Sequence, residues 1–122
     1  MSERYDEGMH VRREVLGDEH VDRAVQGTTP LDADFQRWIT ESVWGDLWAN
    51  PVIDRRTRSL VTIAILAALG SEELALHLRA SLRTGVTDAE LAQVLKHVAV
   101  YAGVPAANTA FARAKAIRGV GA

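Results

Sequence analysis

The sequence predicts an all-α fold in which a single domain, residues 1–122, contains about six to seven helices. No segment alternates apolar and polar residues with a period of two, as a half-buried strand would. Apolar residues instead recur every three or four positions, and only 3 prolines and 9 glycines interrupt them. A chain of 122 residues can bury one core, whereas two independent cores would each be marginal.

Glycine and proline separate the predicted helices from one another. A helix tends to end at glycine, and proline disfavours helical geometry in the residue before it, as at Asn50-Pro51. The expected helices, in order along the chain, cover residues 2–16, 18–25, 32–49, 54–69, 72–84, 88–102 and 104–118. We assign residues 1–30 to an N-terminal helical arm and residues 31–118 to the helical core.

Two of these helices carry more specific signals. The helix that begins at Asp32 should present one broad apolar face, because its large apolar residues are three and four positions apart. They are Phe35, Trp38, Ile39, Val43, Leu47 and Trp48. Before the helix that begins at Asp88, Thr87 and Glu90 have the spacing of a capping box, in which each side chain pairs with the other residue's amide.

Composition excludes several classes of function. Basic residues number 14 and acidic residues 16, so the chain lacks the basic signature of a nucleic-acid-binding protein. It has no cysteine, which excludes disulfides, cysteine-ligated zinc and thiol chemistry. The first residues lack the apolar core of a signal peptide, and the longest apolar run, residues 60–69, is too short to span a membrane. We therefore expect a soluble, cytoplasmic protein that contacts neither nucleic acid nor membrane.

The run from Leu60 to Leu69 is apolar on every side of its predicted helix, with Thr62 as the one interruption. Such a helix must be covered all round. Another subunit could provide part of that cover, which would make the protein a homo-oligomer. A central helix wrapped by its own neighbours is the alternative.

Two histidines interrupt apolar helical stretches and are the candidates for chemistry. His77 follows Glu73 by four residues, a spacing that puts a carboxylate and an imidazole on one helix face as an acid/base pair. The alternative is a helix-start acid beside an incidental, partly buried histidine. His97 lies between Gln93 and Tyr101 at the same spacing, and this polar stripe could line a cleft or satisfy a subunit contact. No histidine spacing typical of a metal site occurs, so we expect no metal.

Arginines cluster at the start of the apolar helix, at Arg55, Arg56 and Arg58. Cations there oppose the helix macrodipole, so an anionic substrate or an acidic partner should favour them. A solvated surface turn is the alternative. The chain also lacks a phosphate-binding loop, a dinucleotide-binding glycine pattern and a nucleophile elbow.

Four motifs in order along the chain resemble the carboxymuconolactone decarboxylase family, over residues 35–117. They are Asp-Arg-Arg-Thr-Arg-Ser-Leu at 54–60, Leu-Ala-Leu-His at 74–77, Gly-Val-Thr at 85–87 with Glu90, and His-Val-Ala-Val-Tyr-Ala-Gly-Val-Pro-Ala-Ala-Asn at 97–108. One branch of that family, similar to alkyl-hydroperoxidase D, uses a Cys-x-x-Cys pair. Here Glu73 stands at the second cysteine position and Ser59 at a usual glutamate, so the resemblance is to the cysteine-free branch.

That resemblance implies an alkyl-hydroperoxidase D-like helical subunit in a ring-like oligomer, a trimer or hexamer, without a cofactor. It implies decarboxylation of 4-carboxymuconolactone, a small anionic lactone, to 3-oxoadipate enol-lactone in protocatechuate (β-ketoadipate) catabolism. In that reaction we assign His77, oriented by Glu73, as proton donor, and His97 or Tyr101 as oxyanion donor. The residues expected to bind substrate are Arg58, Arg55 and Trp48. A related lactone or enolisable acid as substrate, or a non-catalytic oligomer that binds an anion, are the alternatives.

Overall fold

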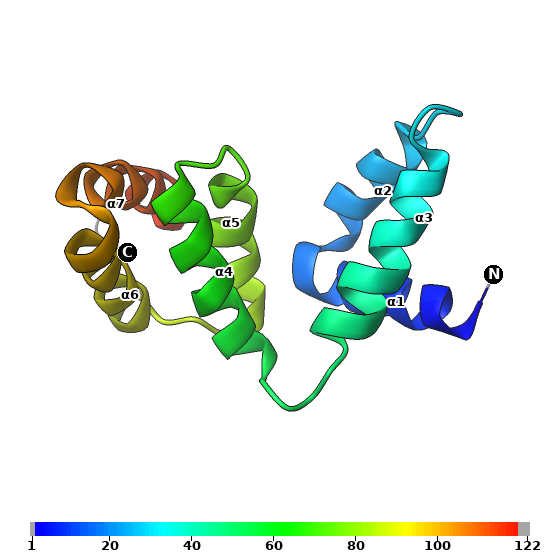
Figure 1. The fold of residues 1–122 in the computed structure, drawn as a ribbon, viewed down its shortest axis with the longest axis horizontal. Helices are drawn as coiled ribbons and strands as arrows, with labels where there is room; N and C mark the ends of the chain where they lie inside the picture. The colour runs from blue at the N-terminus through cyan, green and yellow to red at the C-terminus, as the bar shows by residue number, and fades with distance from the viewer. Residues whose placement is uncertain (1, 120–122) are drawn as a thin grey trace. The chain divides into compact units, whose positions relative to one another are not determined.

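A computed structural model describes residues 2–119, in which all regular secondary structure is helical and no strand occurs (Figure 1). It contains seven α-helices and one π-helix, which confirms the predicted all-α class. The chain forms two compact units, Met1–Arg55 and Arg56–Ala122, which are described separately. Within residues 2–119, no helix is both long and apolar enough to cross a membrane.

The N-terminal unit consists of α1 (Glu3–Leu16), α2 (Asp18–Gln26), α3 (Ala33–Ile39) and the π-helix η1 (Thr40–Trp48). Gly17 separates α1 from α2 with a φ of 89°, a conformation that suits glycine. In Figure 1, α3 and η1 follow one another as one rod beside α1 and α2. The predicted third helix is therefore present, but its second half has a different hydrogen-bonding pattern.

The π-helix changes which apolar side chains are buried. Because its hydrogen bonds join residues five apart, positions four to five apart share a face, and the buried residues of η1 are Thr40, Trp44 and Trp48. The broad apolar face predicted from α-helical spacing is wrong for three large residues, which are about half exposed. They are Phe35 (55% exposed), Trp38 (58%) and Leu47 (54%).

The C-terminal unit contains α4 (Arg55–Leu69), whose first residue belongs to the N-terminal unit, together with α5 (Leu74–Thr84), α6 (Asp88–Ala102) and α7 (Val104–Arg118). One buried cluster joins all four helices, including Ile63 of α4, Leu78 of α5, Leu95 of α6 and Ala110 of α7. The predicted capping box is confirmed, because Thr87 and Glu90 each accept a hydrogen bond from the other's backbone amide. One boundary differs: α5 begins at Leu74, since the Ser71 hydroxyl accepts the Glu73 amide in a preceding turn (3.1 Å).

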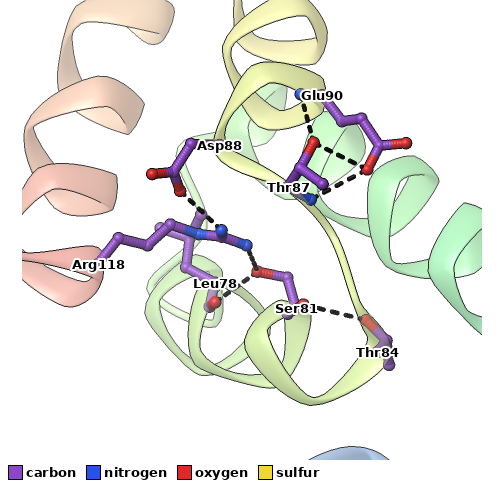
Figure 2. Close-up of polar contacts among 7 residues, drawn as sticks. All are labelled: Leu78, Ser81, Thr84, Thr87, Asp88, Glu90 and Arg118. Atoms are coloured by element: carbon purple, nitrogen blue, oxygen red, sulfur yellow. Dashed lines mark hydrogen bonds and ion pairs between the residues drawn. The ribbon is translucent and has the colours of Figure 1, made fainter. Parts of the chain in front are cut away.

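Polar contacts of Arg118 tie the end of α7 to α5 and α6 (Figure 2). Its guanidinium donates to the Asp88 carboxylate and to the Ser81 hydroxyl, both at 2.8 Å. The Ser81 hydroxyl in turn donates to the Leu78 carbonyl at 2.6 Å. A second polar link joins α4 to α5, where the hydroxyls of Ser59 and Thr84 lie 2.7 Å apart. These contacts fix the four helices that carry most of the predicted site residues.

Candidate active site

A pocket of about 360 Å³ lies between α4 and α6 in the C-terminal unit. Its wall is apolar apart from Gln93 and His97, which are one turn apart on α6. The other lining residues are Leu60, Val61, Ala64 and Val94. Gln93 and His97 are both exposed, so this is an open, mostly apolar hollow of a size that can hold a small molecule. The predicted polar stripe of α6 thus contributes to a cleft.

Tyr101 extends this stripe outward from the pocket. Its ring stacks on His97, with ring centroids 5.0 Å apart and an interplanar angle of 26°. Tyr101 is 81% exposed, whereas the neighbouring Val98 is 5% exposed and packs in the core. The structure therefore brings together Gln93, His97 and Tyr101, with His97 between the pocket and the exposed phenol.

Glu73 and His77 lie one turn apart at the start of α5. Glu73 is the N-cap residue, and its carbonyl accepts the His77 amide at 3.3 Å. The Glu73 side chain is exposed, whereas His77 is partly buried between the core residues Leu74 and Leu78. The position of Glu73 agrees with both interpretations, an acid/base pair with His77 or a helix-start acid beside an incidental histidine. An acid near a helix N-terminus also interacts favourably with the macrodipole.

Arg55 and Arg56 of the arginine cluster have carboxylate partners within the chain. Arg55 pairs with Glu14 at 3.0 Å, and this hydrogen bond and charge hold the pKa of the Glu14 carboxyl below its usual value. Arg56 pairs with Glu90, the acid of the capping box. Acidic side chains thus favour these two cations at the helix start. Arg58 is partly buried on α4.

Trp48 packs within the N-terminal unit. It is 5% exposed, and its ring lies 5.2 Å from that of Trp44, measured between centroids. Trp48 and Arg55 belong to the N-terminal unit, whereas Arg58, His77, His97 and Tyr101 belong to the C-terminal unit with Glu73.

One polar residue of the N-terminal unit was missed by the sequence analysis. Arg12 of α1 is 6% exposed, although it lies in a segment that reads as highly charged and solvated. Its helix position carried a signal, because it falls on the same face as Gly8, Val11 and Val15, all of which are buried. In the described part of the chain, no group of three or more His, Asp or Glu residues is arranged to hold a metal ion.

A family model and several curated decarboxylases are similar in sequence to this chain. The sequence model of the carboxymuconolactone decarboxylase family matches residues 33–116. Among curated proteins, 4-carboxymuconolactone decarboxylase of Acinetobacter baylyi is 47% identical over 116 residues, which cover 94% of this chain and 87% of the relative. Nitrosuccinic acid decarboxylase of Metarhizium robertsii is 41% identical over 104 residues, 83% of this chain and 71% of the relative. A 4-carboxymuconolactone decarboxylase sequence of Pseudomonas putida is 50% identical over 44 residues, 36% of this chain and 92% of the relative.

Proposed function

Because the chain belongs to the carboxymuconolactone decarboxylase family, we propose that it decarboxylates 4-carboxymuconolactone to 3-oxoadipate enol-lactone. The observation that carries this proposal is the near full-length identity to the Acinetobacter baylyi enzyme. The absence of cysteine agrees with it, since thiol-dependent chemistry is unavailable to this chain.

The substrate supplies its own electron sink, so the reaction needs no cofactor. The bond between the ring carbon and its carboxylate breaks, carbon dioxide leaves, and the electron pair passes through the ring double bond to the lactone carbonyl. The resulting dienolate takes a proton on the carbon next to that carbonyl, which gives the enol-lactone. The protein must stabilise the oxyanion, deliver the proton and bind the remaining carboxylate of the acetate arm.

The residues of the candidate site have side chains suited to these tasks. His77 donates the proton, and Glu73, the N-cap residue one turn before it, orients the ring. His97 in the pocket, or Tyr101 stacked on it, donates a hydrogen bond to the oxyanion. Arg58 binds the carboxylate of the substrate, whereas the substrate contacts expected for Arg55 and Trp48 stay predictions. Support for Arg58 is its partly buried position on α4, beside the segment that lines the pocket.

The working form is a homo-oligomer, a trimer or hexamer. Support comes from α4, whose side chains Val61, Ile65 and Leu69 are 51%, 53% and 74% exposed. These residues are four apart, so they form one apolar stripe along the helix. A stripe of this kind on a helix that is apolar on all sides is suited to contact with a second copy of the chain.

The direct test is an ultraviolet assay of the purified chain with freshly generated 4-carboxymuconolactone, with detection of the enol-lactone and of carbon dioxide. His77→Gln should reduce kcat by about 100-fold or more, the effect expected for loss of a general acid. His10→Gln is the matched control, because His10 is 73% exposed on α1. A well-folded wild-type protein that leaves the lactone unchanged would contradict the proposed function.

Nitrosuccinate is the second substrate to supply, since a relative named for that acid is 41% identical over most of this chain. The same preparation is assayed with both acids under identical conditions. A higher kcat/KM for nitrosuccinate than for the lactone would assign the chain to that reaction within the same family.

A further inference from the structure

A second cavity, of about 250 Å³, lies within the N-terminal unit. It is open to solvent on one side and is lined by α1, α3, the start of η1 and the segment at the end of α2. Its apolar lining comes from Met9, Val25 and Ala33, and its polar lining comes from Tyr5, Arg12, Thr28, Gln36, Arg37 and Thr40. The volume is slightly below the range of roughly 300–1,000 Å³ that holds drug-sized ligands, so this cavity suits a small molecule.

Arg12 is the buried charge of this cavity. Its guanidinium donates to the Thr40 hydroxyl at 3.2 Å and to the Gln36 side-chain carbonyl at 3.3 Å. Both acceptors are neutral, and the buried Nε atom of Arg12 has no hydrogen-bond partner among the described residues. Burial lowers the pKa of Arg12, in agreement with these neutral partners.

The adjacent arginine of α1 has a different environment. Arg13 pairs with Asp22 at 2.8 Å and with Asp18 at 3.2 Å. These hydrogen bonds raise the pKa of Arg13. Arg37, the other cation of the cavity lining, pairs with Asp34 on its own helix. Two cations thus line this cavity. Arg37 has a carboxylate partner within residues 2–119, and Arg12 does not.

A buried guanidinium with only neutral partners destabilises the fold, because no opposite charge offsets its loss of hydration. A carboxylate would best offset this loss of hydration, because its two oxygens match the planar donors of arginine. One uncompensated positive charge balances one carboxylate, whereas a phosphate dianion would leave excess negative charge in the cavity. The lining from Met9, Val25 and Ala33 suits an apolar body attached to that group.

We propose that this cavity binds the carboxylate group of a small organic acid, with Arg12 as its ion-pair partner. This is a binding site of the N-terminal unit, additional to the proposed roles of the histidines of α5 and α6. A bound acid would bridge α1, which carries Arg12, to the α3–η1 segment, which carries Gln36 and Thr40. Binding should therefore also stabilise the N-terminal unit.

Met9 provides a local readout, because the chain has only 2 methionines and Met9 lines the cavity. The full-length protein is labelled with ¹³C-methyl methionine and titrated with butyrate at constant ionic strength. The Met9 methyl signal should shift and saturate in the millimolar range, which corresponds to about −4 kcal/mol of binding free energy. Butyramide, the neutral equivalent, and inorganic phosphate should leave the signal in place.

Matched variants locate the effect. Arg12→Gln should weaken butyrate binding by at least about tenfold, which is about 1.4 kcal/mol. Arg23→Gln removes the same charge from the exposed face of α2 and should bind as the wild type does. Ala33→Trp adds a large ring at the exposed part of the lining while keeping Arg12; it should also weaken butyrate binding, and it decides the question if Arg12→Gln does not fold.

Three results would overturn the proposal. They are a Met9 signal that butyrate does not move, a shift that survives in both Arg12→Gln and Ala33→Trp, and a shift that phosphate or butyramide reproduces. Each readout is independent of decarboxylase activity, so failure here leaves the proposed function unaffected.

Discussion

Gly8 of α1 faces the Thr40 carbonyl of η1 so closely that a Cβ atom at position 8 would overlap it. The same Cβ would also lie 2.9 Å from the Gly45 amide nitrogen. Two helices cross here with almost no side chain between their backbones. This crossing fixes the position of η1, and therefore of Trp44 and Trp48, against α1.

Gly8→Ala should destabilise the protein by about 1–3 kcal/mol, the usual cost of overpacking. Helix propensity alone predicts the opposite sign, since alanine favours a helix interior by about 1 kcal/mol over glycine. Urea denaturation followed by circular dichroism measures the difference. Gly27→Ala is the control, because a Cβ there meets only the Arg23 and Ala24 carbonyls, at 3.3 and 3.8 Å. A Gly8→Ala protein as stable as the wild type would contradict the close crossing.

Most helix boundaries could be predicted from the sequence, because the interactions that begin and end a helix join residues close together in the chain. Gly85 ends α5 in a left-handed conformation (φ 87°), and the Thr87–Glu90 capping box begins α6 three residues later. Each signal depends on residues within one turn, so it can be read without knowledge of the fold. The start of α5, by contrast, was predicted at residue 72, whereas the helix begins at Leu74 and Glu73 is its N-cap residue.

The π-helix η1 and the burial of Arg12 could not be predicted from the sequence, because both depend on packing between residues far apart in the chain. The close approach at Gly8 holds α1 against η1, and no spacing in residues 40–48 alone distinguishes a π-helix from an α-helix. Arg12 is buried because Thr40, 28 residues away, lies over it. The pocket residue His97 was found because its α6 stripe has a local pattern. How Arg58 and His77 act on substrate stays a prediction, since sequence spacing says nothing of distances between helices.

Arg55→Gln should raise the pKa of the Glu14 carboxyl toward its ordinary value, because the Arg55 hydrogen bond is the main cause of its depression. A depressed carboxyl pKa contributes stability above the ordinary pKa, and this contribution is lost as the pH falls through the depressed value. Glu14 should therefore take up its proton at a lower pH in the wild type than in the variant. The wild type keeps this contribution to stability down to that lower pH. The side chains of Arg55 and Glu14 are 37% and 47% exposed, so solvent screens the ion pair and the effect on stability should be small.

The measurement is an NMR titration of the Glu14 side-chain carboxyl in both proteins. Arg23→Gln is the control, because Arg23 pairs with Glu19 and does not contact Glu14. An unchanged Glu14 pKa in Arg55→Gln would show that this ion pair does not form in solution.

Ile65→Glu should dissociate the proposed homo-oligomer. Ile65 lies at the middle of the exposed apolar stripe of α4, and a buried carboxylate there would lack a partner in the chain. Analytical ultracentrifugation should show a smaller species while circular dichroism shows unchanged helix content. Ala116→Glu, at an exposed position of α7, adds the same charge and should leave the assembly intact. An unchanged sedimentation coefficient for Ile65→Glu would exclude this stripe from the subunit contact.

His97, and not Tyr101, should be the oxyanion donor. Both side chains are exposed, but His97 lines the pocket between α4 and α6, whereas Tyr101 lies beside it, stacked on the His97 ring. Loss of one oxyanion donor costs about 10²–10³ in kcat, so His97→Phe, which keeps an aromatic ring for Tyr101 to stack on, should lose that much. Tyr101→Phe keeps the same stack and removes only the hydroxyl, so its kcat should stay within a few-fold of wild type. Steady-state assays of the two variants with 4-carboxymuconolactone give the comparison, and a large loss confined to Tyr101→Phe would transfer the role to the phenol.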